Sequence, residues 1–433
     1  MEESGDDNVL AKYVQAYMVR RHTTYIFLLL MVLTFGNLDR AVAQIYDADG
    51  QYVDTVFHDH VNRQADDFVR AYVAIASPGT YLYTILGHAA YHVVCPAFGL
   101  DYYFSAEGEN SPDQVLRFIA GKLKMGMLAI APDEYLSWYA QDNRRVTEWE
   151  LNLTPKQKQR LWQVLDTYMA DWQGIPYDYY HRCCALTVVN IMHEALSPDT
   201  ITYAQPWPER FRKTVRELVR NNTQDYPWTQ MFICFLAGTE VDKNVPAEQR
   251  LIIPQDVVDV WKTAMANGRP LLTGDSIVTS CAKPQPPVEN RTLATPLAMS
   301  LFFVLLSVLA VVLGRTGRSR LAIVAKVIDV IELIVVTAIG VFMTYLIFIS
   351  NLCCTDWNWL IVVFNPLPAV FWYWRRYWAL PYAAVMLVWV VVMALLPHAV
   401  VLPPHIVFTV AWILVLLRQV PWRMGIKSLK AED

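Results

Sequence analysis

The sequence predicts a mixed α+β domain outside a membrane, followed by an α-helical domain that crosses the membrane five times. The 433 residues are 55% hydrophobic and only 18% charged, which is too apolar for a wholly water-soluble chain. After residue 291 the apolar residues gather into five stretches, each close to the length of a membrane span. Residues 44–291 instead have the composition of an ordinary globular domain.

Residues 1–43 have the pattern of a secretory signal peptide. The apolar run Tyr25 to Phe35 is short for a spanning helix but fits a signal sequence, because two arginines precede it and Ala41-Val42-Ala43 follows it as a cleavage site. We therefore expect the mature chain to begin at Gln44. The residues before Met18 are superfluous to a signal, so translation could start at Met18. The alternative is an uncleaved anchor helix.

The outer domain, residues 44–291, has recognisable elements. Apolar spacing predicts a helix from Asp59 to Ile75, and β-forming residues predict strands at Tyr81–Leu86, Ala89–Val94 and Leu100–Phe104. The last two strands form a hairpin centred near Ala97.

Further along, residues 113–130 mix helix and strand signals. Thr154 followed by Pro155 and Gln157 marks a helix start, since it supplies a capping threonine, a proline at the first position and a glutamine three after the cap. The apolar positions of this helix predict a buried face made of Leu161, Val164, Leu165 and Tyr168. A second helix is expected from Cys184 to Leu196.

The five-helix membrane domain, residues 292–418, contains apolar stretches at residues 293–314, 322–350, 357–374, 377–396 and 400–417. Lysine and arginine follow the first, third and fifth stretches, whereas the loops at 351–356 and 397–399 contain neither. The positive-inside rule therefore places the globular domain outside and the tail, residues 419–433, in the cytoplasm. Asp329 and Glu332 share one face of the second stretch, and they indicate either function or a structural ion pair.

Candidate catalytic residues begin with the adjacent Cys183 and Cys184, which open a helical pattern after the run Tyr177-Asp178-Tyr179-Tyr180. A helix start stabilises thiolate over thiol through its free N–H groups and the positive end of its dipole. The cysteine is therefore a candidate nucleophile, and the main-chain N–H groups of Cys184 and Ala185 are suited to bind an oxyanion.

The candidate base is His88, nearly a hundred residues upstream at the start of a strand pattern. The hairpin places His88 opposite about residue 106, so Glu107 is nearer than Asp101, and both remain candidates to orient the imidazole. For His92 on the same strand a packed or hydrogen-bonded role is favoured. Histidine before cysteine reverses the order in papain-like enzymes, which predicts a permuted papain-like fold in which the spatial pair is kept.

Composition and spacing argue against several other classes. The net charge of -4, with no basic cluster outside the cytoplasmic loops, gives no support to nucleic-acid binding. His58-Asp59-His60 offers two ligands without a third, so we expect no metal and no cofactor. All seven cysteines fall on the outer side, where disulfides are permitted, and Cys234 with Cys281 is a possible pair.

Several short motifs together resemble the Lnb family, which are lipoprotein N-acyltransferases of certain Gram-negative bacteria. The order and spacing of the motifs are more specific than any one of them. They are Ser77-Pro78-Gly79 with Gly87-His88, Gly99-Leu100-Asp101, Gly121-Lys122-Leu123, Leu151-Asn152-Leu153-Thr154, the tyrosine run before Cys184-Ala185, Gly238 with Asp242, and Asn365-Pro366-Leu367.

The resemblance implies a permuted papain-like periplasmic domain and five helices in the bacterial inner membrane. It favours Cys184 over Cys183 as the nucleophile, with His88 as the base. The family usually has asparagine where Cys183 stands and arginine where His92 stands, so this chain departs from the pattern beside its site.

The implied reaction starts when His88 takes the proton of Cys184 and the thiolate attacks an acyl ester of a membrane phospholipid. The α-amino group of a diacylated lipoprotein then attacks the resulting thioester to give an amide. Two alternatives remain open: a cysteine-dependent hydrolase of lipid or cell wall with the same fold, and a non-catalytic envelope scaffold.

Overall fold

The computed structural model describes residues 62–109, 111–171, 173–279, 294–395 and 401–420, and also two short strands, β1 (Ile45–Tyr46) and β2 (Tyr52–Val53), which pair antiparallel. The chain divides into two compact units between Arg63 and Gln64. The signal peptide, the motif His58-Asp59-His60, Cys281 and most of the predicted tail lie outside the described residues.

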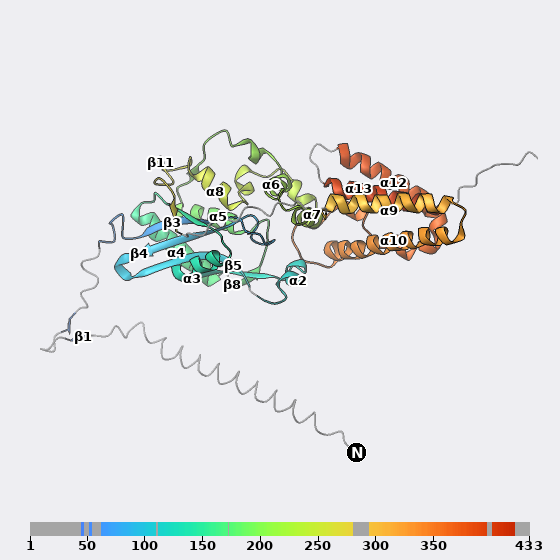
Figure 1. Cartoon of the computed structure of the whole chain (residues 1–433). Coiled ribbons are helices and arrows are strands. Elements are labelled where there is room, and N and C mark those ends of the chain that lie inside the picture. The colour runs from blue at the N-terminus through green and yellow to red at the C-terminus, as the bar shows by residue number, and fades with distance from the viewer. Residues whose placement is uncertain are drawn as a thin grey trace, which may run out of the picture. The chain divides into compact units, whose positions relative to one another are not determined.

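A seven-stranded antiparallel sheet forms the centre of the outer domain, in the order β12-β7-β3-β4-β5-β6-β8 (Figure 1). The strands are β3 (Arg70–Ala76), β4 (His88–Cys95), β5 (Leu100–Gly108), β6 (Lys124–Ile130), β7 (Val146–Glu150), β8 (Gln173–Pro176) and β12 (Ile277–Val278). A small second sheet joins β9 (Ile201–Thr202), β10 (Met265–Ala266) and β11 (Arg269–Pro270).

Helices cover both faces of the central sheet. Because side chains alternate along a strand, Val73 and Ile75 of β3 join the large core that includes α4 (Pro155–Asp171) and α5 (Cys184–Leu196). Ala74 and Ala76 point the other way, into a smaller core with Tyr135 and Tyr139 of α3 (Pro132–Gln141).

The remaining described elements of the outer domain are short. They are η2 (Pro96–Phe98), α2 (Gln114–Ile119), η3 (Glu209–Arg212), α6 (Val215–Asn222), α7 (Pro227–Leu236), η4 (Thr239–Asp242), η5 (Ala247–Arg250) and α8 (Pro254–Trp261).

Two of the predicted elements are wrong. Of the helix expected from Asp59 to Ile75, the described part, residues 62–75, is instead a turn region followed by β3, because this strand pairs on both sides and is buried on both faces. A strand of that kind is apolar throughout and gives no alternation to tell it from a helix. Tyr81–Leu86 forms turns rather than a strand, held by N–H groups of Gly79 and Thr84 that donate to the carbonyls of Thr84 and Tyr81.

Other predictions are confirmed. The hairpin of β4 and β5 turns at Pro96–Phe98, and α4 begins at Pro155 with the Thr154 hydroxyl accepting from the Gln157 N–H at 3.3 Å. All four residues expected on the buried face of α4 are buried.

Among the described residues, three helices of the membrane domain are long and apolar enough to cross a bilayer, namely Pro296–Arg315 (α9), Ser319–Phe348 (α10) and Trp372–Leu395, which includes α12 (Arg375–Leu395). Two apolar segments are shorter: Trp359–Val370, which contains η6 (Trp359–Val362) and α11 (Leu367–Val370), and α13 (Pro403–Gln419). The five predicted stretches fall on these elements and on the following turn η7 (Trp372–Trp374), and a count of five crossings stays a prediction.

The third apolar stretch is not one continuous helix, because Pro366 lacks a backbone N–H and Asn365, just before it, bonds back to the preceding turn. Its side-chain amide donates to the carbonyls of Ile361 and Val362 at 3.0 and 3.2 Å, which gives those carbonyls the partners that a continuing helix would supply.

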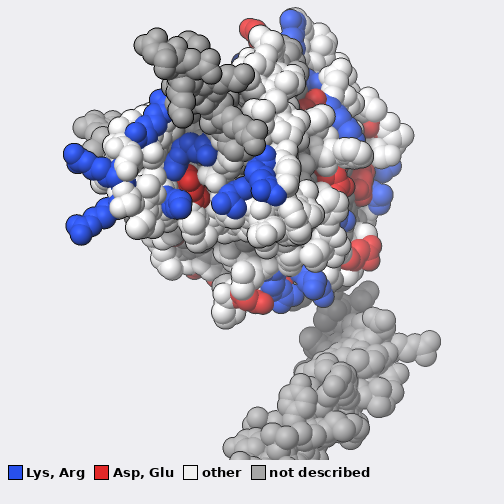
Figure 2. Space-filling view, turned by 90° about the vertical axis from the view of Figure 1, so that its right-hand side faces the viewer, with Lys and Arg blue, Asp and Glu red and all other residues white. Residues whose placement is uncertain are grey.

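The two acidic residues of α10 belong to polar contacts between helices. Arg418 of α13 binds Asp329 through both terminal nitrogens, at 2.8 and 2.9 Å. Ser307 of α9 donates to Glu332, with its hydroxyl within 2.8 and 2.7 Å of the two carboxylate oxygens. The ion pair expected as the structural alternative is therefore present for Asp329, whereas Glu332 has a hydrogen bond from Ser307. Figure 2 views the molecule from the right-hand side of Figure 1 and shows lysine and arginine spread over a mostly uncharged surface.

Backbone contacts join the outer domain to the loop after α10. The N–H of Asn351 donates to the carbonyl of Ala120, and the N–H of Gly238 donates to the carbonyl of Cys354 at 2.6 Å. A Cβ atom at Gly238 would lie 1.9 Å from the carbonyl oxygen of Asp356, so only glycine fits there. The loop 351–356 is therefore held between the segments around Gly121 and Gly238.

Candidate active site

Cys183 and Cys184 occupy the start of α5 with different surroundings. Cys183 is the N-cap residue and is buried, with its sulfur 4.0 Å from the carbonyl oxygen of Ile252. Burial raises the pKa of the Cys183 thiol to about 12, so it stays protonated near neutral pH. Cys184 is the first residue of the helix and is partly exposed. Cys184 is therefore the less buried of the two residues.

A glycine turn places His88 at the beginning of β4. Gly87 has φ +90°, and a Cβ atom there would lie 2.8 Å from the carbonyl oxygen of Ala76. Both constraints favour glycine, because an L side chain rarely adopts this φ and no space is available for it. Ala76 is also the cross-strand partner of His88, so the turn and the sheet together fix the histidine backbone.

One side of the imidazole contacts a serine and a glutamate on β5. His88 Nε2 lies 2.7 Å from the hydroxyl of Ser105 and 3.3 Å from Oε1 of Glu107, and the hydroxyl donates to the same glutamate oxygen at 2.7 Å. The register Ala90 to Ser105, continued by two residues, sets His88 opposite Glu107. Since these contacts use Nε2, Nδ1 is left for a partner on the other side of the ring.

Cys184 lies close enough to the imidazole of His88 for a side-chain hydrogen bond, and this interaction shifts the pKa of both groups. Burial alone would raise the pKa of this thiol, but the charge of His88, its hydrogen bond and the Ala89 N–H together hold the pKa below its usual value. Burial likewise opposes protonation of His88, yet the negative charges of Cys184 and Glu107 raise the pKa of the imidazole well above its usual value. The geometry therefore favours a thiolate and imidazolium ion pair.

Glu107 stays ionised beside this pair. Burial raises the pKa of its carboxyl group, but the charge and hydrogen bond of His88 outweigh it, so that the pKa is lowered overall. The hydrogen bond from Ser105 and the nearby charge of Arg144 act in the same direction. Arg144 in turn lies over the ring of Tyr139, 4.7 Å from its centroid, and that ring stacks beside His88.

His92 and Asp101 form a separate group further along the same strands. Asp101 lies 2.7 Å from Nε2 of His92, whose Nδ1 lies 3.1 Å from Glu148. Tyr103 also donates to Glu148 and stacks on His92. The structure therefore brings Glu107, and not Asp101, to His88. His92 has the hydrogen-bonded, packed surroundings favoured from sequence.

Main-chain donors for an oxyanion lie at the first turn of α5, where N–H groups have no partner within the helix. Those of Cys184 and Ala185 are the expected pair.

Sequence reasoning missed Ser105, Tyr139 and Arg144. Ser105 had a usable signal, because it precedes Glu107 by two residues and must share its face of the strand. Tyr139 and Arg144 come from α3 and the turn after it, and nothing in their spacing links them to His88.

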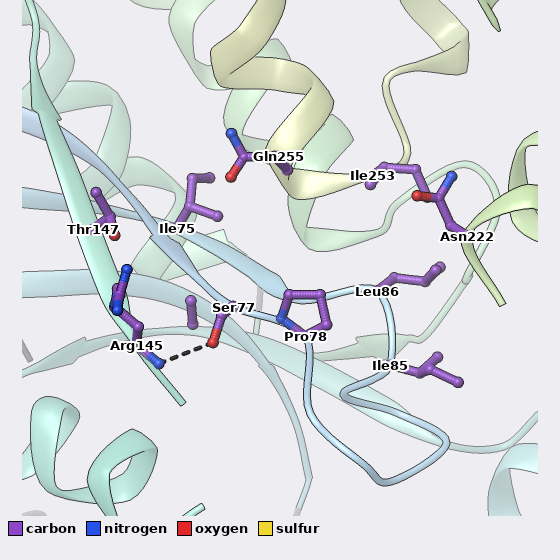
Figure 3. Close-up of a pocket in the computed structure, with 11 residues that line it drawn as sticks. Ile75, Ser77, Pro78, Ile85, Leu86, Arg145, Thr147, Asn222, Ile253 and Gln255 are labelled. Carbon is purple, nitrogen blue, oxygen red and sulfur yellow. Dashed lines mark hydrogen bonds between the residues drawn. The ribbon is translucent and has the colours of Figure 1, made fainter. Parts of the chain in front are cut away.

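A cavity of about 270 Å³ opens next to the start of β4 (Figure 3). Its lining combines apolar side chains, among them Ile75, Ile85 and Ile253, with nearly as many polar ones. Leu86 and Ala76 lie in the wall and also flank Gly87 and His88. In Figure 3 the N–H of Arg145 donates to the Ser77 hydroxyl at one edge, at 2.9 Å.

Comparison with known proteins gives two family matches. The model of the Lnb N-terminal periplasmic domain matches residues 62–221, and the model of the Lnb transmembrane domain matches residues 288–428. No curated protein and no solved structure matches the chain.

Proposed function

The chain belongs to the Lnb family, with a periplasmic and a transmembrane part, and we propose on this basis that it is a lipoprotein N-acyltransferase. It moves an acyl chain from a membrane phospholipid, through a thioester on Cys184, to the α-amino group of a diacylglyceryl-cysteine lipoprotein. The observation that carries the proposal is the hydrogen bond between Cys184, at the start of α5, and His88.

The first half of the reaction forms the thioester. The Cys184 thiolate attacks the carbonyl carbon of an acyl ester, and the N–H groups of Cys184 and Ala185 stabilise the oxyanion. The ester C–O bond then breaks, and the proton held by His88 passes to the leaving oxygen. A lysophospholipid departs, and His88 is left neutral.

The second half transfers the acyl group to nitrogen. The neutral α-amino group attacks the thioester carbonyl, His88 takes a proton from the nitrogen, and the C–S bond breaks to release the thiolate. The product is an amide, and the ion pair of Cys184 and His88 is restored. Glu107 does not touch the reacting atoms and acts as a positioning residue through its contact with Nε2 of His88.

The membrane domain supplies the setting for two lipid substrates. We propose that the protein lies in the bacterial inner membrane with five crossings and the catalytic domain in the periplasm. Three helices that could span a bilayer, two shorter apolar segments and the match to the Lnb transmembrane domain support this. Loop 351–356, which contacts the outer domain, would then lie at the outer leaflet, where both substrates are anchored.

The test is the mass of the N-terminal peptide of a diacylated lipoprotein expressed together with this protein. We expect one additional acyl chain, absent with Cys184→Ala and with His88→Ala but present with Cys183→Ala. Unchanged acylation in both Cys184→Ala and His88→Ala would overturn the proposed site. Acylation lost in Cys183→Ala and kept in Cys184→Ala would move the nucleophile by one residue.

A parallel measurement separates transfer from hydrolysis. The same membranes, given a phospholipid with labelled acyl chains, should pass the label to the lipoprotein with little free fatty acid. Label found only in free fatty acid, dependent on Cys184, would assign the protein as a lipid hydrolase. No Cys184-dependent loss of donor phospholipid would favour the scaffold.

A further inference from the structure

A group of metal-ligating side chains lies outside the catalytic pair, where three segments distant in sequence meet. His181 stands in the loop before α5, Glu240 in η4, and Cys354 in the loop after α10. One ligand atom from each of the three residues lies within 4.8 Å of the others. We propose that this cluster binds a zinc ion.

Backbone contacts bring the three segments together independently of these side chains. The N–H of Gly238, just before η4, donates to the carbonyl of Cys354, and the N–H of Thr239 donates to the carbonyl of Asp356. The hydroxyl of Tyr179, in the loop before α5, donates to the carbonyl of Cys353 at 3.0 Å. The convergence is therefore a property of the fold.

The imidazole of His181 is held in the form that a metal needs. Its Nδ1 lies 2.8 Å from Oδ2 of Asp178, whose other oxygen accepts the N–H groups of Tyr180 and His181, both at 2.9 Å. A proton on Nδ1 then leaves the lone pair of Nε2 free, as in the carboxylate–histidine–metal arrangement of zinc sites. Nε2 points toward Glu240, 3.9 Å from its Oε1.

The donor set selects the metal. A thiolate, an imidazole and a carboxylate suit zinc, which takes sulfur, nitrogen and oxygen ligands, whereas calcium and magnesium prefer oxygen alone. Zinc bonds of about 2.0–2.3 Å hold tetrahedral donors roughly 3.3–3.8 Å apart, so a shift of about 1 Å closes the set. The side chains of His181 and Glu240 are 51% and 35% exposed and can make this shift.

Two further side chains lie next to the three proposed ligands. Lys243 lies 3.8 Å from Glu240 and is 68% exposed, so its side chain can rotate away when a cation binds. The thiol of Cys353 contacts Asp178 and Cys354 and lies beside the three donors. Three protein ligands leave the fourth position of a tetrahedral ion for water or for this second thiol.

Such an ion would join the nucleophile loop to the membrane domain, since His181 precedes Cys184 by three residues and Cys354 follows α10. The inference does not depend on the proposed acyl transfer. Its test therefore measures metal binding and stability, which remain informative if acylation fails.

The experiment uses the full chain purified in detergent. Elemental analysis should find about one zinc per chain, and protein stripped by a chelator should take up Co²⁺ with the visible bands and thiolate charge-transfer band of a tetrahedral site. Zinc should also raise the melting temperature of the stripped protein.

Cys354→Ser and His181→Ala should each lower the zinc content at least about tenfold and remove the thiolate band. Glu240→Gln, which keeps the size of the side chain, should weaken zinc binding without loss of fold. The matched control is His193→Ala, because His193 also pairs with a glutamate, Glu248, in the same domain and is also partly exposed. It should retain the ion.

Two results would overturn the proposal. One is wild-type protein that takes up neither zinc nor Co²⁺ in the stripped form. The other is an unchanged metal content in His181→Ala and Cys354→Ser, which would place any bound ion elsewhere. A disulfide between Cys353 and Cys354 in protein purified without reductant, together with absence of metal, would also overturn the proposal.

Discussion

Glu107 Oε1 lies 3.3 Å from Nε2 of His88, and the hydroxyl of Ser105 hydrogen bonds to both. A charged carboxylate in this position fixes the plane of the imidazole and stabilises its protonated form. Asparagine often holds this place in papain-like cysteine enzymes, whereas here it is held by an acid with a serine bridge.

Replacing Glu107 by glutamine should therefore reduce acyl transfer about 100-fold, because the imidazolium loses its charge partner while the hydrogen bond to Ser105 remains. Asp101→Asn is the control, since Asp101 contacts His92 instead. Rates of label transfer from phospholipid to lipoprotein provide the measurement. Equal losses in the two variants would contradict a special role for Glu107.

The ion pair predicts a distinctive pH dependence of alkylation at Cys184. The pKa of this thiol is lowered and that of His88 is raised, so the thiolate–imidazolium pair is the main form between the two values. Iodoacetamide should therefore modify Cys184 at pH values below the ordinary thiol pKa of about 8.5. Below the lowered pKa the sulfur gains a proton, and its reactivity should fall.

The pH series is followed by mass spectrometry of the peptide that contains Cys184. In His88→Ala the onset of alkylation should move to higher pH, because the charge that stabilises the thiolate is gone. Cys183 provides an internal comparison, since its raised pKa should keep it unreactive across the range. Alkylation of Cys184 only above the ordinary thiol pKa would contradict the ion pair.

Gly87→Ala should destabilise the fold by about 1–3 kcal/mol and lower activity further, because both φ and the Ala76 carbonyl oppose a side chain next to His88. Gly99→Ala is the matched control: Gly99 also has positive φ, +64°, but a Cβ atom there meets nothing within 4 Å. Thermal unfolding of both variants, with label transfer measured alongside, gives the comparison. If Gly99→Ala lowers the melting temperature more than Gly87→Ala does, the explanation from φ and the Ala76 carbonyl is wrong.

Arg216 predicts a large effect on stability. It is buried and donates to Asp242 at 2.8 and 2.9 Å, and also to the carbonyls of Ala237 and Gly238. Arg216→Met leaves a carboxylate without its partner and should cost about 3–5 kcal/mol.

Lys262→Met removes the charge from an exposed pair with Asp259 and should cost at most about 1 kcal/mol. Denaturant unfolding of the two variants provides the comparison. Similar decreases in the free energy of unfolding would show that the buried Arg216 pair contributes no more to stability than the exposed Lys262 pair.

Local signals predicted much of the fold correctly. The helix starts at Thr154 and Cys184, and the hairpin near Ala97, depend on residues close in sequence. The strand β3 was missed because its neighbours in the sheet, β4 and β7, decide its conformation. Propensity along the chain cannot report that pairing.

The candidate site was predictable to the same extent. His88 and Cys184 stand at element starts with recognisable chemistry, and the register of the hairpin near Ala97 placed Glu107 nearer to His88 than Asp101. The grouping of His181, Glu240 and Cys354, for which we propose zinc binding, was not predictable, since the three positions form no ligand spacing. The expectation of no metal from sequence stays a prediction.

The close approach of Gly238 to the carbonyl of Asp356 limits how this chain can be rearranged. Gly121 lies equally close to the main chain of Asn351 and Leu352, so the outer domain and the loop after α10 contact each other directly through their backbones. A chimera that joins the outer domain to the membrane helices of another protein would need Gly121, Gly238 and the loop 351–356 to come from the same parent protein.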